Sequence, residues 1–235
     1  MKGAVLVLIA LLGAAGRAQA FEAVDLERLR RTGLCPGCDL SGVDLSGTKL
    51  RRGTLIDSGP LRLDLSGADL RRAILPRAAL SRAILNGADL RGAVLREADL
   101  RRADLRAARL ARADLRQADL SSARLDDADL RRADLREARL TGARLAGANL
   151  AGADAGAAIL VRASLNGADL SGADLRRAFL SETDLRGARL DRTDLRAADL
   201  RNADGLTQFQ LDQACGDETT VLPDWFVIRP CDRYQ

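Results

Sequence analysis

A leucine recurs at every fifth position of this 235-residue chain from residue 40 to residue 200. Of these 33 positions, 31 are Leu, and the exceptions are Pro60 and Ala155. Two residues before each Leu, from position 68 to position 203, 26 of 28 residues are Ala, and the other two are Thr183 and Thr193. The residue directly before the Leu is most often Asp, so the unit is Ala-Asp-Leu followed by two variable residues. A repeat of this regularity decides the fold before any other feature of the chain.

A period of five fits none of the common elements. In an α-helix, five residues turn about 500°, so successive leucines would form no stripe. In a strand, an odd period would place them on alternating faces, and a coiled coil needs a period of 3.5. A chain that makes a quarter turn every five residues does bury the pattern, because each Leu and each Ala then points to a common axis. Four units would close one coil of twenty residues, and coils would stack at about 4.8 Å.

This pattern resembles the repeats of the pentapeptide-repeat family over residues 38–204. The resemblance implies an all-β solenoid, a right-handed quadrilateral β-helix, in which the central Leu and the small residue two before it face inward. About eight coils would give a rod of about 40 Å. The outward Asp is suited to accept hydrogen bonds from turn N–H groups, and Gly at the fifth position is suited to tight turns.

Both ends of the chain depart from the repeat. Residues 1–20 combine a basic start, an uncharged apolar run and a small-x-small site at Ala18–Ala20, which is typical of a cleaved signal peptide. We therefore expect an exported protein, periplasmic or extracellular, with no membrane span after cleavage. Residues 21–37 predict a short cap helix that leads to a Cys-x-x-Cys motif. Residues 205–235 predict a second cap, with a capping-box helix from Thr207 to about Ala214. The segment from Val221 to Ile228 is expected to form a hydrophobic lid on the last coil through Leu222, Trp225, Phe226 and Val227.

Four cysteines in an exported chain favour disulfides, and three pairings of them are possible. A rod would hold Cys35 and Cys38 about 40 Å from Cys215 and Cys231, so we expect one structural clip at each end. This separation argues against a four-cysteine zinc site. A thioredoxin-like redox role for the Cys35–Cys38 motif is the alternative, but the motif lacks the βαβ context.

Stacking at twenty residues per coil also predicts rows of charge on the outside. One face would carry a row of aspartates beside a row of arginines that is broken at Gly156; the residues are Asp114, Asp134, Asp154, Asp174, Asp194, Arg116, Arg136, Arg176 and Arg196. A solvated face that keeps the rod soluble is one interpretation, and a charged lattice that docks a partner or a cation is the other.

The composition excludes several functions. There is no His, which removes His-based catalysis and His-ligated metals, and the aromatic content is only 3%. We expect no enzyme activity, no cofactor and no metal. Nucleic-acid binding is disfavoured because the repeats intersperse basic and acidic residues.

The sequence predicts an exported structural or interaction rod whose partner is an unknown protein or envelope component. Two alternatives stay open. One is a DNA mimic that binds gyrase, as the resemblance implies for some family members, although that role needs an acidic surface and a cytoplasmic location. The other is a scaffold for the envelope or for a surface polymer. A disulfide-closed, acidic C-terminal end favours a monomer over a dimer.

Overall fold

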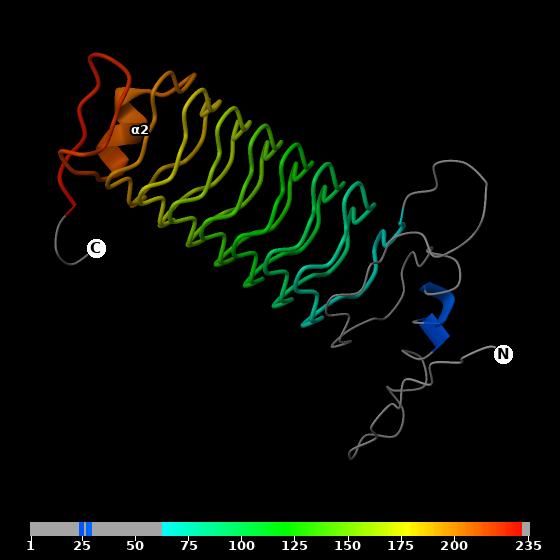
Figure 1. Ribbon diagram of the computed structural model, residues 1–235. Coiled ribbons are helices and arrows are strands. Elements are labelled where there is room, and N and C mark those ends of the chain that lie inside the picture. Colours follow the sequence, from blue (N-terminus) through cyan, green and yellow to red (C-terminus); the bar gives the residue numbers. More distant parts are fainter. Residues whose placement is uncertain (1–23, 26, 30–62, 232–235) are drawn as a thin grey trace.

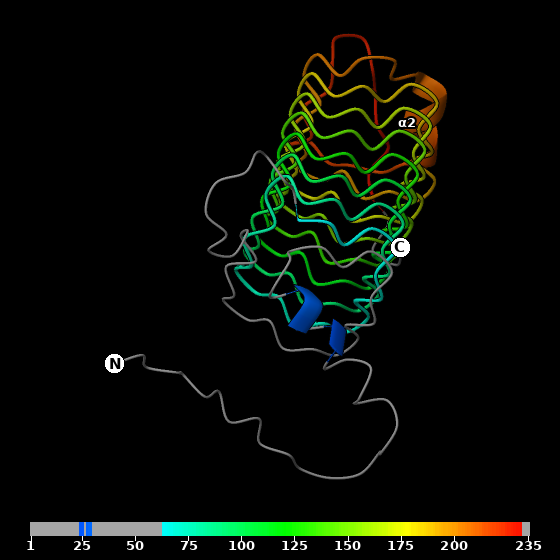
Figure 2. The ribbon, with the colours of Figure 1, turned by 90° about the vertical axis from the view of Figure 1, so that its right-hand side faces the viewer.

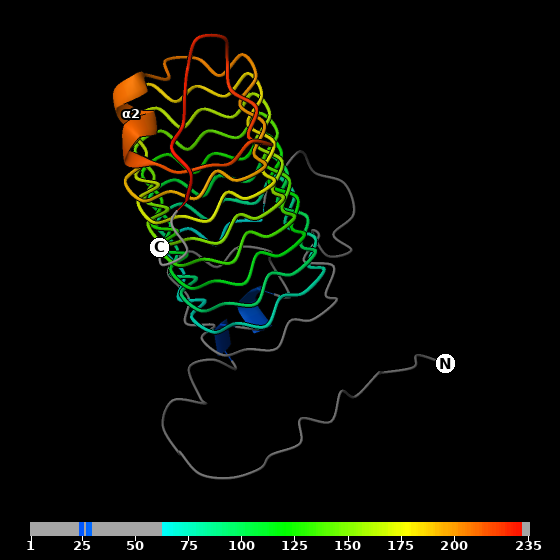
Figure 3. The ribbon, with the colours of Figure 1, turned by 90° about the vertical axis from the view of Figure 1, so that its left-hand side faces the viewer.

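The computed structural model describes residues 24–25, 27–29 and 63–231, and it is built as one stack of coils (Figure 1). Side views show the coils in register, with helix α2 on the outside of the stack near its C-terminal end (Figures 2 and 3). The predicted signal peptide, most of the predicted N-terminal cap, Cys35, Cys38 and the interrupted unit at Pro60 lie outside the described residues.

The coils have a period of twenty residues. Parallel bridges join residues twenty apart from Asp64↔Ile84 to Asp184↔Asp204, so the 140 residues from 65 to 204 make seven coils. Each side of a coil pairs through a single residue. The bonds are regular: Leu70 N–H donates to the Asp89 carbonyl at 2.7 Å, and Asp89 N–H donates to the Ala68 carbonyl at 2.9 Å. This quarter-turn geometry confirms the architecture that the five-residue period predicts.

The core consists of the two inward positions of each unit. The central leucines from Leu65 to Leu200 are at most 2% exposed, and the alanines two residues before them are at most 3% exposed up to Ala198. Thr183 and Thr193 replace Ala in two units and are fully buried. Their hydroxyls donate to the Leu160 and Leu170 carbonyls at 3.0 and 2.9 Å, which satisfies both groups.

Every corner of the coil requires a left-handed residue. The Ala N–H of each unit bonds the carbonyl of the preceding Leu, as in Ala88 to Leu85 at 3.0 Å, and this closes a β-turn. The residue before that Ala has a positive φ in every unit from Gly67 to Asn202. Gly holds the position in some units, but Arg, Glu, Ala and others hold it elsewhere, as at Arg132 with φ 55°.

We expect Gly87→Ala to lower the free energy of unfolding by about 1 kcal/mol, the cost of placing a Cβ in the left-handed region. Gly87 has a φ of 67°, and an added Cβ would meet no atom within 4 Å, so steric contact contributes nothing. Urea denaturation would measure the change. Ala107→Gly at the equivalent turn, where φ is 53°, is the control and is not expected to destabilise. An unchanged midpoint for Gly87→Ala would contradict the expected backbone cost.

Ala155 stands where a central Leu would fill the axis. It is 2% exposed, and its backbone N–H keeps the ladder bond to the Asp174 carbonyl at 2.7 Å. We expect Ala155→Leu to raise the free energy of unfolding by about 1 kcal/mol, because it restores buried apolar volume. A lower melting temperature for this variant would show that the neighbouring side chains already fill the space.

After Asp204 the chain leaves the repeat at Gly205 and forms helix α2, Gln208–Gln213. Thr207 caps the helix: its side chain accepts from the Gln210 N–H, while the Gln210 side chain accepts from the Thr207 N–H. The Gln210 amide then donates to the Leu185 and Ala188 carbonyls at 2.9 and 2.8 Å. The Ala188 carbonyl is equivalent to those that accept from the next coil elsewhere in the stack, such as that of Ala168, so the Gln210 side chain takes the place of a further coil there.

The segment after α2 again pairs with the preceding coil through parallel backbone bridges. Cys215 bridges to Asp194 and Val221 bridges to Asp199, although the spacing is now one or two residues longer than twenty. Leu195 N–H donates to the Cys215 carbonyl at 2.8 Å. The C-terminal segment thus covers part of the open edge that a solenoid would otherwise leave exposed.

The predicted hydrophobic lid is correct for Leu222 and Phe226, which pack against the core, and wrong for Trp225 and Val227. Trp225 is 87% exposed, and Phe209 and Val227 are also exposed. The Gln208 side chain bonds both the N–H and the carbonyl of Val227, which fixes this loop, and Trp225 has a φ of 67°. The residues that pack against the core are Leu206, Leu211, Ala214, Leu222, Phe226 and Ile228.

At the other end, residues 24–25 and 27–29 have helical backbone. Leu29 is 3% exposed and belongs to the core, whereas Val24 is exposed. In the described part of the chain, no helix has the length and apolar character needed to cross a membrane.

Candidate functional site

The predicted row of aspartates exists. Parallel bridges connect Asp114, Asp134, Asp154, Asp174 and Asp194 in succession, each on the next coil. Each carboxylate accepts a hydrogen bond from the backbone N–H two residues later, for example from Arg136 to Asp134 at 3.3 Å and from Gly156 to Asp154 at 3.2 Å. This confirms the predicted use of Asp at the turn.

The arginines lie between the carboxylates. Arg116 contacts its own Asp114 at 2.9 Å and Asp134 of the next coil at 3.4 Å. Arg136 repeats the arrangement with Asp134 at 2.6 Å and Asp154 at 3.4 Å. Like charges stacked at coil spacing would repel, but in three of the four gaps a guanidinium contacts the carboxylates on both sides. We call these nine residues, with Gly156 at the break, the Asp–Arg ladder.

Gly156 interrupts the ladder in the middle of the rod. The side chain of Asp154, the aspartate that lacks its own Arg, is 41% exposed, compared with 27% for Asp134. The neighbouring surface recess is lined by four arginines, three acidic residues and several small residues; the charged ones are Arg136, Arg176, Arg177, Arg196, Glu137, Asp154 and Asp217. The recess therefore carries both signs of charge and selects neither a cation nor an anion.

The ladder shifts the acidity of its carboxyls. Burial raises the pKa of Asp114, but hydrogen bonds from Arg116 and Arg96 outweigh it and lower this pKa to about 2. Burial also opposes ionisation of Asp134 and Asp174, and their own arginines again lower the pKa. Carboxylates held this way stay ionised and hydrogen-bonded, so they are poor proton acceptors for acid–base catalysis.

The same pairing recurs on other faces. Wherever Asp-Leu-Arg occurs in register, the Arg folds back onto the Asp two residues before it; the pairs include Asp69–Arg71, Asp89–Arg91, Asp99–Arg101, Asp104–Arg106, Asp129–Arg131, Asp184–Arg186 and Asp199–Arg201. Sequence reasoning singled out one row, but the Asp-Leu-Arg triplet is the general signal. The Asp–Arg ladder differs from these pairs because it has an aspartate at the same position of five successive coils.

Acid should weaken the rod. Because the folded-state pKa of Asp114, Asp134 and several other paired aspartates lies below the unfolded value, the unfolded chain binds more protons as the pH falls. Their contribution is complete above about pH 5 and is lost progressively toward the folded pKa, near 2 for Asp114. We expect the melting temperature to fall steadily from pH 5 to pH 2. Asp114→Asn should flatten this dependence, and an unchanged slope would contradict the assignment.

The C-terminal cysteines form the predicted disulfide. Cys215 and Cys231 are bonded, with their Cα atoms 4.8 Å apart and a sequence separation of 16. Asp194 Oδ1 lies 3.6 Å from the Cys231 sulfur. These three residues are close enough to share an ion, but both sulfurs are in the disulfide and offer no thiolate to a metal.

Square coils of four five-residue units, stacked in parallel around a Leu and Ala core, define the class of quadrilateral β-helices. The model of pentapeptide repeats matches residues 64–102, 98–136, 138–178 and 168–204, and the chain belongs to the pentapeptide-repeat family, whose β-helix is right-handed. Proteins of this family are generally non-enzymatic. No curated protein matches the chain at a significant level.

Solved structures with the same repeat come from several sources. HetL of the cyanobacterium Nostoc sp. strain PCC 7120, a protein involved in heterocyst differentiation regulation, shares 30% identity over 83% of this chain and 97% of its own, with a TM-score of 0.41. QnrB1, a plasmid-mediated fluoroquinolone resistance protein, shares 21% identity over 66% of this chain and 82% of its own, with a TM-score of 0.54. A thylakoid-lumen pentapeptide-repeat protein of Arabidopsis thaliana shares 29% identity over 43% of this chain and 63% of its own, with a TM-score of 0.34.

Proposed function

We propose that this protein is an exported interaction rod that presents fixed charged surfaces to a protein or an envelope component. The observation that carries this proposal is the Asp–Arg ladder. Three of its four guanidinium groups contact carboxylates on two coils at once, as Arg136 contacts Asp134 and Asp154. A partner that meets such a surface loses less conformational freedom on binding than it would against mobile side chains.

Export is part of the proposal. Residues 1–20 have the signal-peptide pattern, and the Cys215–Cys231 disulfide is suited to an oxidising compartment such as the periplasm or the extracellular space. N-terminal sequencing of the protein from the periplasm or medium is expected to begin at Phe21. Recovery from the cytoplasm with residue 1 or 2 at the N-terminus would refute export.

The gyrase-binding alternative receives no support from the surface chemistry. The likeness to QnrB1, at 21% identity, concerns the fold alone. A DNA mimic needs rows of uncompensated negative charge, whereas carboxylates along the ladder are paired with arginines, as in Asp114–Arg116 and Asp174–Arg176. A supercoiling assay with gyrase is expected to show no inhibition at micromolar protein.

The interaction itself is tested by capture from a periplasmic and envelope extract. The bait is the wild-type protein, the ladder variant Arg136→Gln/Arg176→Gln, or the control Arg106→Gln/Arg186→Gln, which removes two equivalent pairs from another face. A partner retained by the wild type and the control but lost from the ladder variant supports the proposal. Equal retention by all three baits would count against the ladder as the binding surface.

A further inference from the structure

A surface groove runs along one corner of the rod. It has a volume of about 1200 Å³ and is lined by the two corner residues of five successive coils, from Arg71 and Arg72 to Ala151 and Gly152. Six of its ten lining residues are arginines: Arg71, Arg72, Arg91, Arg112, Arg131 and Arg132. The remaining four are Gly or Ala.

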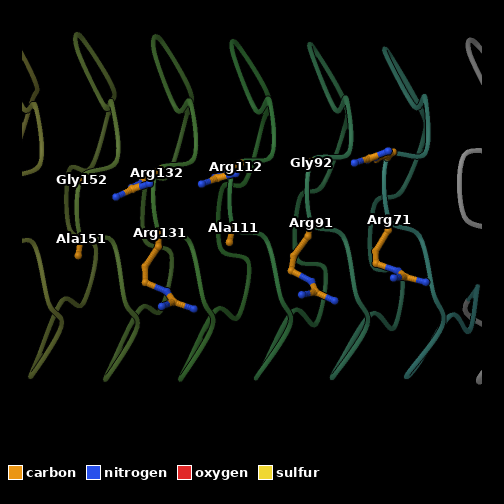
Figure 4. A pocket seen from close by; sticks show the side chains of 10 residues that line it. Arg71, Arg91, Gly92, Ala111, Arg112, Arg131, Arg132, Ala151 and Gly152 are labelled. Carbon is orange, nitrogen blue, oxygen red and sulfur yellow. The ribbon is translucent and has the colours of Figure 1, made fainter.

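The arginines form two parallel rows that line the groove (Figure 4). In the first row, Arg71, Arg91 and Arg131 are held by the aspartates two residues before them, with N–O distances of 2.6 to 2.7 Å. The second row is Arg72, Arg112 and Arg132. No carboxylate in the described part of the chain forms an ion pair with these three, so their guanidinium groups are available to a ligand.

The small residues shape the groove and complete its pattern. Gly92 interrupts the second row on a coil where Arg91 is present, and Ala111 interrupts the first row where Arg112 is present. Each of four successive coils therefore contributes at least one guanidinium. The stems of Arg72 and Arg132 lie over the next coil, since a Cβ added to Gly92 or Gly152 would lie 3.7 or 3.5 Å from their Cγ atoms. Both values are ordinary van der Waals distances, so the stems lie directly over the two glycines.

We propose that this corner groove binds an acidic glycan, a polysaccharide that carries a carboxylate on each sugar residue. The coils repeat at about 4.8 Å, which is close to the length of one sugar residue in an extended glycan. An extended chain along the groove would thus advance by about one sugar per coil. Carboxylates that face the groove, on every sugar or on alternate sugars, would stay in register with the guanidinium groups of the four coils. Guanidinium groups pair with carboxylates in a planar, two-bond geometry, which suits a ligand with regularly spaced carboxylates.

Other polyanions fit this groove less well. A single-stranded nucleic acid is bound mainly through base stacking on aromatic side chains, and none of the ten lining residues is aromatic. In an extended acidic peptide, side chains on one face recur at about 6.6 Å, which falls out of register with the coils within a few residues. The proposal rests on the proposed function, because it names the partner chemistry of an exported rod.

The test is the binding of the purified full-length protein to polygalacturonate, measured by calorimetry at low ionic strength. The groove variant is Arg72→Gln/Arg112→Gln/Arg132→Gln. Glutamine is compatible with this backbone, because Gln117 occupies the equivalent left-handed position with a φ of 57°. The matched control, Arg82→Gln/Arg102→Gln/Arg177→Gln, removes the same charge at the same turn position on other corners. Circular dichroism checks that both variants fold.

We expect the groove variant to bind polygalacturonate at least about tenfold more weakly, with a shallower dependence on salt, and the control to change by less than about twofold. Equal weakening by both variants would overturn the proposal, since it would mean that only net charge matters. Stronger binding of poly-glutamate or polyphosphate than of polygalacturonate would also overturn it. If polygalacturonate does not bind while the ladder still captures an envelope partner, the glycan proposal fails and the interaction rod stands.

Discussion

Replacing Leu130 with alanine is expected to lower the free energy of unfolding by about 3 kcal/mol, within the usual range for a buried leucine. Leu130 is fully buried at the axis of a central coil, and its backbone N–H donates to the Asn149 carbonyl at 2.7 Å. Such ladder bonds fix the spacing of the coils, so the neighbouring layers cannot collapse into the space. The inward residue on the same side is already Ala128, which cannot enlarge to fill it. Urea denaturation followed by circular dichroism measures the change.

Leu130→Met is the matched control, because it nearly conserves volume and should cost less than about 1.5 kcal/mol. The central position matters in addition, since a solenoid is stabilised by contacts between neighbouring repeats and a central defect weakens two interfaces at once. Leu200→Ala, near the last coil, is therefore expected to cost less than Leu130→Ala. A cost below about 1 kcal/mol at Leu130 would mean that the coils do relax, and the rigid-core explanation would be wrong.

The core was predictable because its rule is local and repeats without a break. Once the period is known to be five, only a quarter turn per unit buries every Leu, and the phase of the Ala two residues earlier follows. The Thr residues at 183 and 193 obey the same rule, since Thr is small and its hydroxyl finds a carbonyl inside the coil. The Asp turn was predictable for a similar reason: a short acceptor beside a tight turn bonds the N–H two residues on.

The turn backbone was predictable only in part. Gly at 67 and 87 signals a left-handed residue, but Arg132 and Arg162 take the same conformation without any such signal. At these positions the backbone hydrogen bonds between stacked coils impose the left-handed conformation. The many hydrogen bonds per coil outweigh the local cost of about 1 kcal/mol. Regular tertiary structure overrides residue preference at these corners.

The arginine-lined groove and the conformation of the C-terminal loop could not be predicted from the sequence. Arg72 and Arg112 are forty residues apart in sequence, so they belong to one surface only after the coil period is fixed at twenty. Trp225 is a case in which the sequence led to a wrong prediction: its apolar neighbours predicted burial, but its side chain is exposed. Hydrogen bonds between the Gln208 side chain and the Val227 backbone fix that loop instead. The spacing of these two residues in the sequence does not predict these hydrogen bonds.

Removing the C-terminal disulfide is expected to have the second large effect. A bond that closes a loop of sixteen residues stabilises by about 3 kcal/mol in the chain-entropy account. Cys215 also takes part in the backbone hydrogen bonds between coils. Its N–H donates to the Thr193 carbonyl at 3.0 Å, and its carbonyl accepts from the Leu195 N–H at 2.8 Å. Beyond it, the Gly216 N–H bonds the Arg229 carbonyl, and the Cys231 N–H bonds the Gly216 carbonyl. The disulfide therefore holds the last layer against the edge of the stack.

Hydrogen exchange on Cys215→Ser/Cys231→Ser should locate the loss. We expect faster exchange at the Leu195 and Leu200 amides, whose acceptors are the Cys215 and Val221 carbonyls, and unchanged exchange at Leu130 in the centre of the rod. Cys35→Ser/Cys38→Ser is the control, since it leaves the C-terminal end intact. Because a solenoid unfolds from its ends when a cap is weakened, the exposed edge left by the Ser variant should also promote association of the rods. Unchanged exchange at Leu195 would show that α2 and its Gln210 contacts hold the end without the disulfide.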